Sequence, residues 1–197
     1  KGLAERAIKT LNQALARDAK NTLVLYNLGK AYFYREDYES ALKSFQRARE
    51  IAPSDNDIKK MISKCSRLMG RYRESVDLML NLIDTIASDV RALLELAGDL
   101  KMLERFDEAL DVYRRASTVA CDSIEPLLGI YDCQLRLGSR DKAMTALKRA
   151  IMVEPANQQL LVNLADLYLA DGRIQEAVDA INRGMETIRD PHMLREK

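Results

Sequence analysis

The side chains that most often carry catalysis or bind metals are few in this chain and poorly spaced to act together. The cysteines are Cys65, Cys121 and Cys133, and no two of them form a C-x-x-C pair. The single histidine, His192, lies close to the last residue. Zinc sites need several Cys or His ligands at short spacing, and histidine is the commonest general base. We therefore predict no catalytic residue, no metal site and no cofactor.

Carboxylate pairs such as Glu104 and Asp107 remain as candidates for acid–base chemistry. They fall in segments that we expect to be turns between helices, where solvated charge is usual. The chain also has no glycine-rich phosphate loop, no nucleophile elbow and no H-E-x-x-H pair. We therefore expect this segment not to be an enzyme.

Composition favours an all-α protein without strong charge. Lys and Arg number 31 against 30 Asp and Glu, a net charge of +1, which gives no general attraction to nucleic acid or anionic membrane. No apolar run approaches the roughly 18 to 20 residues that a membrane span needs. Only 4 prolines and 8 glycines interrupt a chain rich in helix-forming residues. The chain opens Lys1-Gly2-Leu3 with no initiator Met and no leader, so we expect an excerpt of a longer protein.

The elements that position these side chains repeat at a period of 34 residues. One column of small residues contains Ala7, Ala41, Ser75, Ala109, Ala143 and Ala177. Within each period apolar residues recur three and four apart, so each helix carries one apolar stripe. A glycine that tolerates positive φ ends the first helix in three periods, at Gly70, Gly138 and Gly172. A single helical hairpin cannot cover its stripe, so the hairpins must stack and share a core.

The residues of the first complete period closely resemble the tetratricopeptide repeat signature: Leu25, Leu28-Gly29, Tyr32, Ala41, Phe45, Ala48 and Pro53. The resemblance covers 22–55, 56–89, 90–123, 124–157 and 158–191. It implies an all-α fold, a right-handed α-solenoid of stacked antiparallel helix hairpins, and a single domain over 1–197. We expect 1–21 to be the second helix of a partial repeat and 192–197 to start a further or capping helix, with Asp190-Pro191 as its cap.

Two repeats depart from the signature. Lys59, Ser66 and Ser75 replace apolar or small residues in 56–89, which we expect to be the softest part of the stack. Tyr131 stands where glycine or alanine is usual, so we expect unusual packing in 124–157.

The repeat also decides between a disulfide and free thiols. Cys65 and Cys133 hold the same repeat position two units apart, and helix layers lie about 8–10 Å apart, beyond the roughly 7 Å limit for a disulfide. Free cysteines acting as small core residues fit a reducing compartment, so we expect a cytoplasmic protein.

The resemblance also implies a binding surface, because first helices of such stacks line a concave groove. The expected groove residues are Tyr26, Asn27, Lys30, Phe33, Lys60, Lys64, Arg67, Arg91, Glu95, Asp132, Asn163 and Asp166. Lys101 and Glu125 map to the same groove. Its charge would be basic toward the N-terminal end and acidic toward the C-terminal end. The alternative is that these charges belong to two ordinary solvated surfaces with no binding role. Tyr32 falls on the core column instead. Asn27 and Asn163 are expected to hold a ligand backbone, but the pattern that binds acidic chaperone tails is not matched.

We therefore expect a protein-interaction scaffold that binds a peptide or helical segment of a partner, without nucleic acid and without membrane insertion. A self-assembling scaffold that associates through its end faces is one alternative. A substrate-selecting region of a larger enzyme, such as a transferase, is another. Binding of single-stranded RNA is a third alternative, and the near-neutral charge argues against it. A steep salt dependence of the affinity for RNA would support it.

Overall fold

The computed structural model describes residues 2–189 of the chain, and side chains as far as residue 182. Within the described residues the chain forms 11 α-helices and no strand, as the repeat pattern predicts. It divides into two compact units, residues 1–86 and 87–197. The predicted helix start at Asp190-Pro191, the helix at 192–197 and His192 lie outside the described residues.

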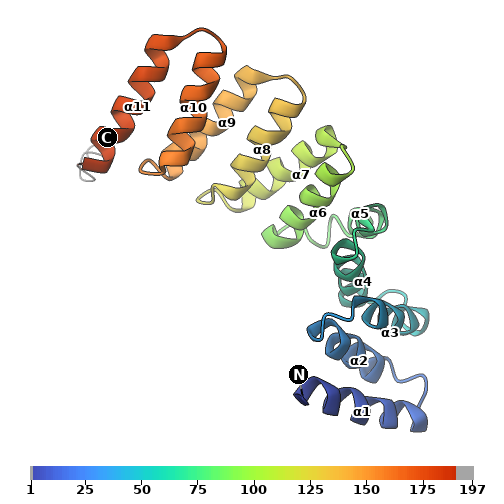
Figure 1. Cartoon of the computed structure of the whole chain (residues 1–197). Coiled ribbons are helices and arrows are strands. Elements are labelled where there is room, and N and C mark those ends of the chain that lie inside the picture. The colour runs from blue at the N-terminus through green and yellow to red at the C-terminus, as the bar shows by residue number, and fades with distance from the viewer. Residues whose placement is uncertain (1, 190–197) are drawn as a thin grey trace. The chain divides into compact units, whose positions relative to one another are not determined.

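Unit 1, residues 1–86, contains five helices. They are α1 (Gly2–Arg17), α2 (Thr22–Tyr34), α3 (Tyr38–Ile51), α4 (Asn56–Leu68) and α5 (Tyr72–Leu80). Each helix packs against the next along the chain (Figure 1). Asn21, Asp37 and Asp55 cap the starts of α2, α3 and α4 by accepting hydrogen bonds from backbone N–H groups of the first turn.

Unit 2, residues 87–197, contains six further helices. They are α6 (Val90–Met102), α7 (Phe106–Val119), α8 (Glu125–Arg136), α9 (Arg140–Val153), α10 (Gln158–Ala170) and α11 (Ile174–Arg189). Sequential helices again pack as hairpins, and the first helices α6 and α8 also touch each other directly. The core consists of the leucine and alanine stripes of these helices, including Leu93, Leu96, Leu147 and Leu160.

The turn after each first helix has the same backbone conformation in all five hairpins. Gly70, Gly138 and Gly172 have φ of 74°, 72° and 72°, which confirms the prediction for these glycines. Glu36 and Glu104 hold the equivalent positions with φ of 64° and 58°. In each turn two N–H groups donate back to the last carbonyls of the helix, as in a Schellman motif. Repeat position therefore selects this conformation even where the residue is not glycine.

Close approach within the first hairpin depends on a missing side chain. A Cβ atom added to Gly29 would lie 2.6 Å from the ring of Phe45, which is fully buried. The ring therefore occupies the volume that any other residue would need.

The second hairpin departs from the others where its sequence does. The hydroxyls of Ser63 and Ser75 share a buried hydrogen bond of 2.8 Å between α4 and α5, so the replacement at Ser75 is satisfied by its neighbour Ser63. The hydroxyl of Ser66 is fully buried and has no hydrogen-bond partner within the described residues. Unsatisfied hydroxyls in a core are costly, so this position weakens the hairpin.

Helix α5 has 9 residues, whereas α3, α7 and α9 have 14 each. The side-chain amide of Asn81 donates to the carbonyl of Asp77 at 2.8 Å, and the backbone N–H of Asn81 reaches the same oxygen only at 3.4 Å. Such side-chain competition disfavours a continuing helix. The chain goes on as turns that still bury Leu82 and Ile86 in unit 1.

Candidate functional site

The unit 1 face is the surface of α2 and α4 that carries Tyr26, Asn27, Lys30, Phe33, Lys60, Lys64 and Arg67. All are half-buried except Asn27, which is exposed. The ring of Tyr26 packs edge-on against Phe45 at 5.6 Å between centroids, and Lys30 Nζ lies 5.7 Å from the Tyr26 centroid. Burial raises the pKa of Tyr26, with smaller effects from Asp57 and Asp55. Tyr26 is thus partly a packing residue with one side open to solvent.

Phe33 joins the two first helices of unit 1. Its ring contacts Tyr38 at 5.4 Å and Tyr34 at 6.3 Å, and Lys64 Nζ from α4 lies 5.4 Å from its centroid. Cation–π contacts of this kind hold a lysine over an aromatic face. The unit 1 face therefore presents ammonium groups on an aromatic base, and four of its seven residues are cationic.

The unit 2 face is the surface of α6, α8 and α10 that carries Arg91, Glu95, Lys101, Glu125, Asp132, Asn163 and Asp166. Arg91 pairs with Glu95 at 3.5 Å, one turn along the same helix. Lys101 on α6 forms an ion pair with Asp132 on α8. Asp166 is exposed, and the half-buried Asn163 accepts a hydrogen bond of 2.8 Å from Gln159. Part of the predicted charge is therefore neutralised inside unit 2.

A cavity of about 470 Å³ opens on the unit 2 face between α6 and α8. Its lining includes Lys101, Tyr113, Glu125, Gly129, Tyr131 and Asp132. A Cβ atom on Gly129 would lie 2.3 Å from the ring of Tyr113, so the bare backbone of α8 lets this ring from α7 pass against it. Burial raises the pKa of Tyr113 to about 12, with added effects from Cys133, Asp132 and Glu125, so its hydroxyl stays protonated at neutral pH.

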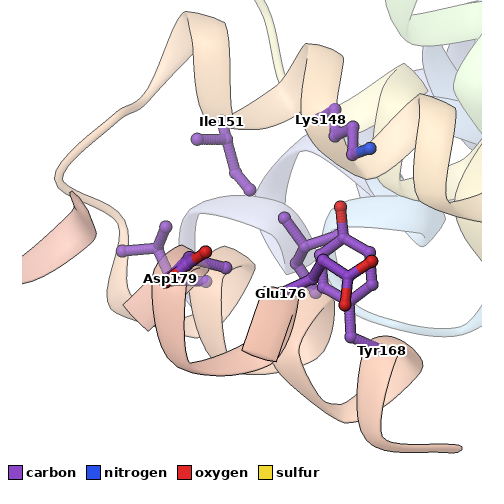
Figure 2. A pocket seen from close by; sticks show the side chains of 8 residues that line it. Lys148, Ile151, Tyr168, Glu176 and Asp179 are labelled. Carbon is purple, nitrogen blue, oxygen red and sulfur yellow. The ribbon is translucent and has the colours of Figure 1, made fainter. Parts of the chain in front are cut away.

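A second cavity of about 450 Å³ lies among α9, α10 and α11. Figure 2 shows Lys148 and Ile151 on α9 facing Tyr168, Glu176 and Asp179 across this space. Lys148 Nζ lies 5.4 Å from the Tyr168 centroid. Arg173 binds Glu176 at 2.9 Å, and this hydrogen bond lowers the pKa of Glu176. The Arg173–Glu176 pair and the Lys148–Tyr168 contact lie beside the leucine and isoleucine side chains that line the same cavity.

The two buried thiols, those of Cys65 and Cys133, are held in the protonated form. Burial raises the pKa of Cys65 to about 12 and that of Cys133 to about 11, with a smaller opposing effect from Lys64 and Lys101 respectively. Both are core residues, as predicted, but Cys121 is exposed in the turn between α7 and α8, which the core prediction did not anticipate. The described residues contain no cluster of three potential metal ligands. None of the helices in residues 2–189 is both long and apolar enough to cross a bilayer.

Comparison with known proteins decides the family. The tetratricopeptide repeat profile matches residues 23–55, and a second tetratricopeptide repeat profile matches residues 134–195. The chain is a tetratricopeptide repeat protein. Such repeats bind other proteins, so this segment is a protein-interaction scaffold in the general sense.

Curated relatives match this tetratricopeptide chain over short parts of their own length. The DnaJ homolog subfamily C member 3 homolog of Dictyostelium discoideum is 43% identical over 54 residues, 27% of this chain and 11% of that protein. Superkiller protein 3 of Schizosaccharomyces pombe is 30% identical over 125 residues, 64% of this chain and 9% of that protein. The chain thus spans a small fraction of either relative.

Solved tetratricopeptide structures show the same fold. A structure of MamA aligns with a TM-score of 0.75 at 15% identity, covering 89% of this chain and 96% of that one. YrrB, described as a TPR protein with an unusual peptide-binding site, aligns with a TM-score of 0.72 at 17% identity, covering 93% and 94%. At these identities the likeness concerns the fold alone.

Position within a tetratricopeptide repeat places the predicted groove residues on the first helices, but it does not place Tyr113 at the floor of the cavity. Tyr113 belongs to a second helix and holds the column of Phe45, so repeat position assigned it to the core. The available signal was Gly129 at a groove position, two residues before the unexpected Tyr131. A glycine in a helix often marks the close approach of another group.

Proposed function

We propose that the unit 1 and unit 2 faces bind segments of a partner protein, with each unit favouring segments of opposite charge. The observation that carries this proposal is the set of half-buried cations on the unit 1 face that rest on aromatic rings. Lys30 lies over Tyr26 and Lys64 over Phe33, so both ammonium groups are held in place before any ligand arrives. Preorganised groups lose less conformational entropy on binding.

The preferred ligand of the unit 1 face is an acidic peptide segment. Charge complementarity steers association and fixes orientation more than it adds affinity. Asn27 is exposed on the same face and can donate to and accept from a peptide backbone. On the unit 2 face, Glu125 and Asp166 supply the opposite charge for a basic segment, and Asn163 plays the part of Asn27.

The test is quantitative affinity capture from native lysate with three versions of the chain. One carries Lys30→Glu and Lys64→Glu on the unit 1 face, and another carries Asn163→Ala and Asp166→Lys on the unit 2 face. The matched control reverses charge at Lys43 and Arg149, which are exposed on the second helices α3 and α9. Circular dichroism verifies folding. A protein that is lost only from a face variant supports the proposal, whereas equal capture by all three versions refutes it.

Self-association is a second candidate function, favoured by one apolar strip on α11. Ile174, Val178 and Ile181 lie three or four residues apart and are 66%, 46% and 41% exposed. Exposed apolar strips of this kind mark contact surfaces. Sedimentation velocity over a range of concentrations tests it: the mass of the parent should rise with concentration, and Val178→Lys should abolish the rise. A parent that stays monomeric would remove this candidate.

A further inference from the structure

The cavity between α6 and α8 contains a polar group that the fold itself does not use. Tyr113 is 7% exposed, and its ring reaches the cavity from α7. Its hydroxyl makes no hydrogen bond with any described residue. The hydroxyl is not among the fully buried polar atoms without a partner, so it faces the open cavity and is available to a ligand group.

This arrangement is particular to one hairpin junction. In the first hairpin the equivalent residue, Phe45, lies against Gly29 and is fully buried without a polar atom to offer. The next equivalent residue is Leu147, also fully buried. Among the described residues of this column, only Tyr113 combines a hydroxyl with a bare neighbouring backbone, at Gly129, along which the ring can extend toward the unit 2 face.

The charges around the cavity define what it can accept. Lys101 and Asp132 form an ion pair at its edge, so they largely cancel. Glu125 is exposed at the rim and makes no ion pair with the described residues, so one negative charge is left uncompensated. Two aromatic rings, Tyr113 and Tyr131, line the same space, and aromatic faces attract cations. The cavity therefore fits a cation that also carries several hydrogen-bond donors.

We propose that this cavity, hereafter the Tyr113 notch, binds the guanidinium group of an arginine side chain from a partner protein. A guanidinium is planar and can stack on the ring of Tyr131. Its five N–H donors can reach the oxygen of Tyr113 and the carboxylate of Glu125 together. A lysine ammonium matches the charge but not the planar stacking. The Tyr113 notch would therefore make the unit 2 face prefer arginine to lysine in a basic segment. This inference rests on the function proposed above.

The probe is N-acetyl-L-arginine amide, titrated into the full ¹⁵N-labelled chain and followed by NMR. We expect saturable shifts of the backbone amides of Gly129, Tyr131 and Asp132, with unit 1 amides unmoved. The citrulline analogue has the same shape without charge and should shift none of them. The lysine analogue should bind at least several-fold more weakly.

Two variants assign the contacts. Tyr113→Phe keeps the ring and removes the hydroxyl, and it should weaken the probe about tenfold, as expected for a lost hydrogen bond to a charged group. Glu125→Gln is an exposed change that leaves the core intact and should weaken the probe a few-fold. Gln158→Glu, exposed at the start of α10, is the matched control and should change nothing.

Shifts equal for arginine and citrulline, no shifts in the notch, or full binding by both variants would overturn the proposal. The two proposals fail separately. If the probe does not bind but the face variants still lose a captured protein, the notch is refuted and the interaction surface stands. If the probe binds the notch but capture is the same for every version, the notch stands and the wider interaction surface is refuted.

Discussion

Replacing Glu36 and Glu104 by glycine should stabilise the protein, because both residues hold a left-handed backbone conformation. Their φ angles are 64° and 58°, in the region where a side chain costs about 1–2 kcal/mol relative to glycine. Glycine also gains freedom in the unfolded chain, which removes about 0.4–1 kcal/mol of that benefit. The expected net gain is about 0.5–1 kcal/mol at each site.

The structure isolates the backbone effect at these two positions. Both glutamates are exposed, and neither takes part in an ion pair with the described residues. Their N–H groups donate to the carbonyls of Phe33 and Lys101 at 2.9 Å in each case, and glycine keeps these bonds. Glu36 lies in unit 1 and Glu104 in unit 2, so each substitution reports on one unit.

The assay is urea denaturation followed by circular dichroism. With an m-value of about 2 kcal/mol/M, each substitution should raise the midpoint of its own unit by about 0.3–0.5 M. Gly138→Ala tests the same effect in reverse: φ is 72° with open space around the added Cβ atom, so a loss of about 1 kcal/mol is expected. Gly98→Ala, in the interior of α6 with no atom within 4 Å, should instead stabilise by about 1 kcal/mol. If both glutamate substitutions lower the midpoint, or Gly138→Ala is neutral, the positive φ does not control stability.

Four further outcomes follow from packing and burial. Gly29→Ala should destabilise unit 1 by about 1–3 kcal/mol, because its Cβ atom would overlap the ring of Phe45; unchanged urea stability would contradict this. Ser66→Ala should raise the stability of unit 1 by about 1 kcal/mol, because it removes a buried hydroxyl without a hydrogen-bond partner. A lower stability in the same urea assay would show that the Ser66 hydroxyl is satisfied. A thiol reagent at pH 8 should label Cys121 fast and the buried thiols only on unfolding. Burial raises the pKa of the Cys65 thiol to about 12 in the folded protein, whereas the pKa of an unfolded cysteine is about 8.5. The stability that the protonated thiol contributes is therefore complete below about pH 8.5 and is lost as the pH rises toward about 12. A series of unfolding midpoints measured over this pH range would reveal the loss.

Helix positions were predictable because a repeat imposes one pattern many times. The stripe of apolar residues and the glycines at Gly70 and Gly138 each place a hairpin turn without reference to tertiary structure. The same register extends the turn to Glu36 and Glu104, whose residue types alone argue against a left-handed conformation. Local propensity is overridden there by the packing of the flanking helices.

The sequence predicts which first-helix positions the groove residues hold, but it does not predict which side chains pair with one another. The sequence places Lys101 and Asp132 on one face, yet only the structure brings them together as an ion pair across two helices. Tyr113 illustrates the other limit, because its column belongs to the core. The Tyr113 ring reaches the cavity because Gly129, in the following hairpin, has no side chain in its way. Tyr113 and Gly129 hold different positions of the repeat, so comparing one repeat position at a time does not reveal this contact.

The packing of each helix against its neighbours in sequence has a consequence for how the protein reaches this structure. Among the described residues of each unit, the main contacts join helices that are neighbours in sequence or one repeat apart, so the loops that must close during folding are short. Proteins dominated by such local contacts fold fast, and folding can begin at any well-formed hairpin and spread to the next. A hairpin weakened by its own sequence, such as the one with Ser66, then delays only its neighbours, and the remaining hairpins form without waiting for it.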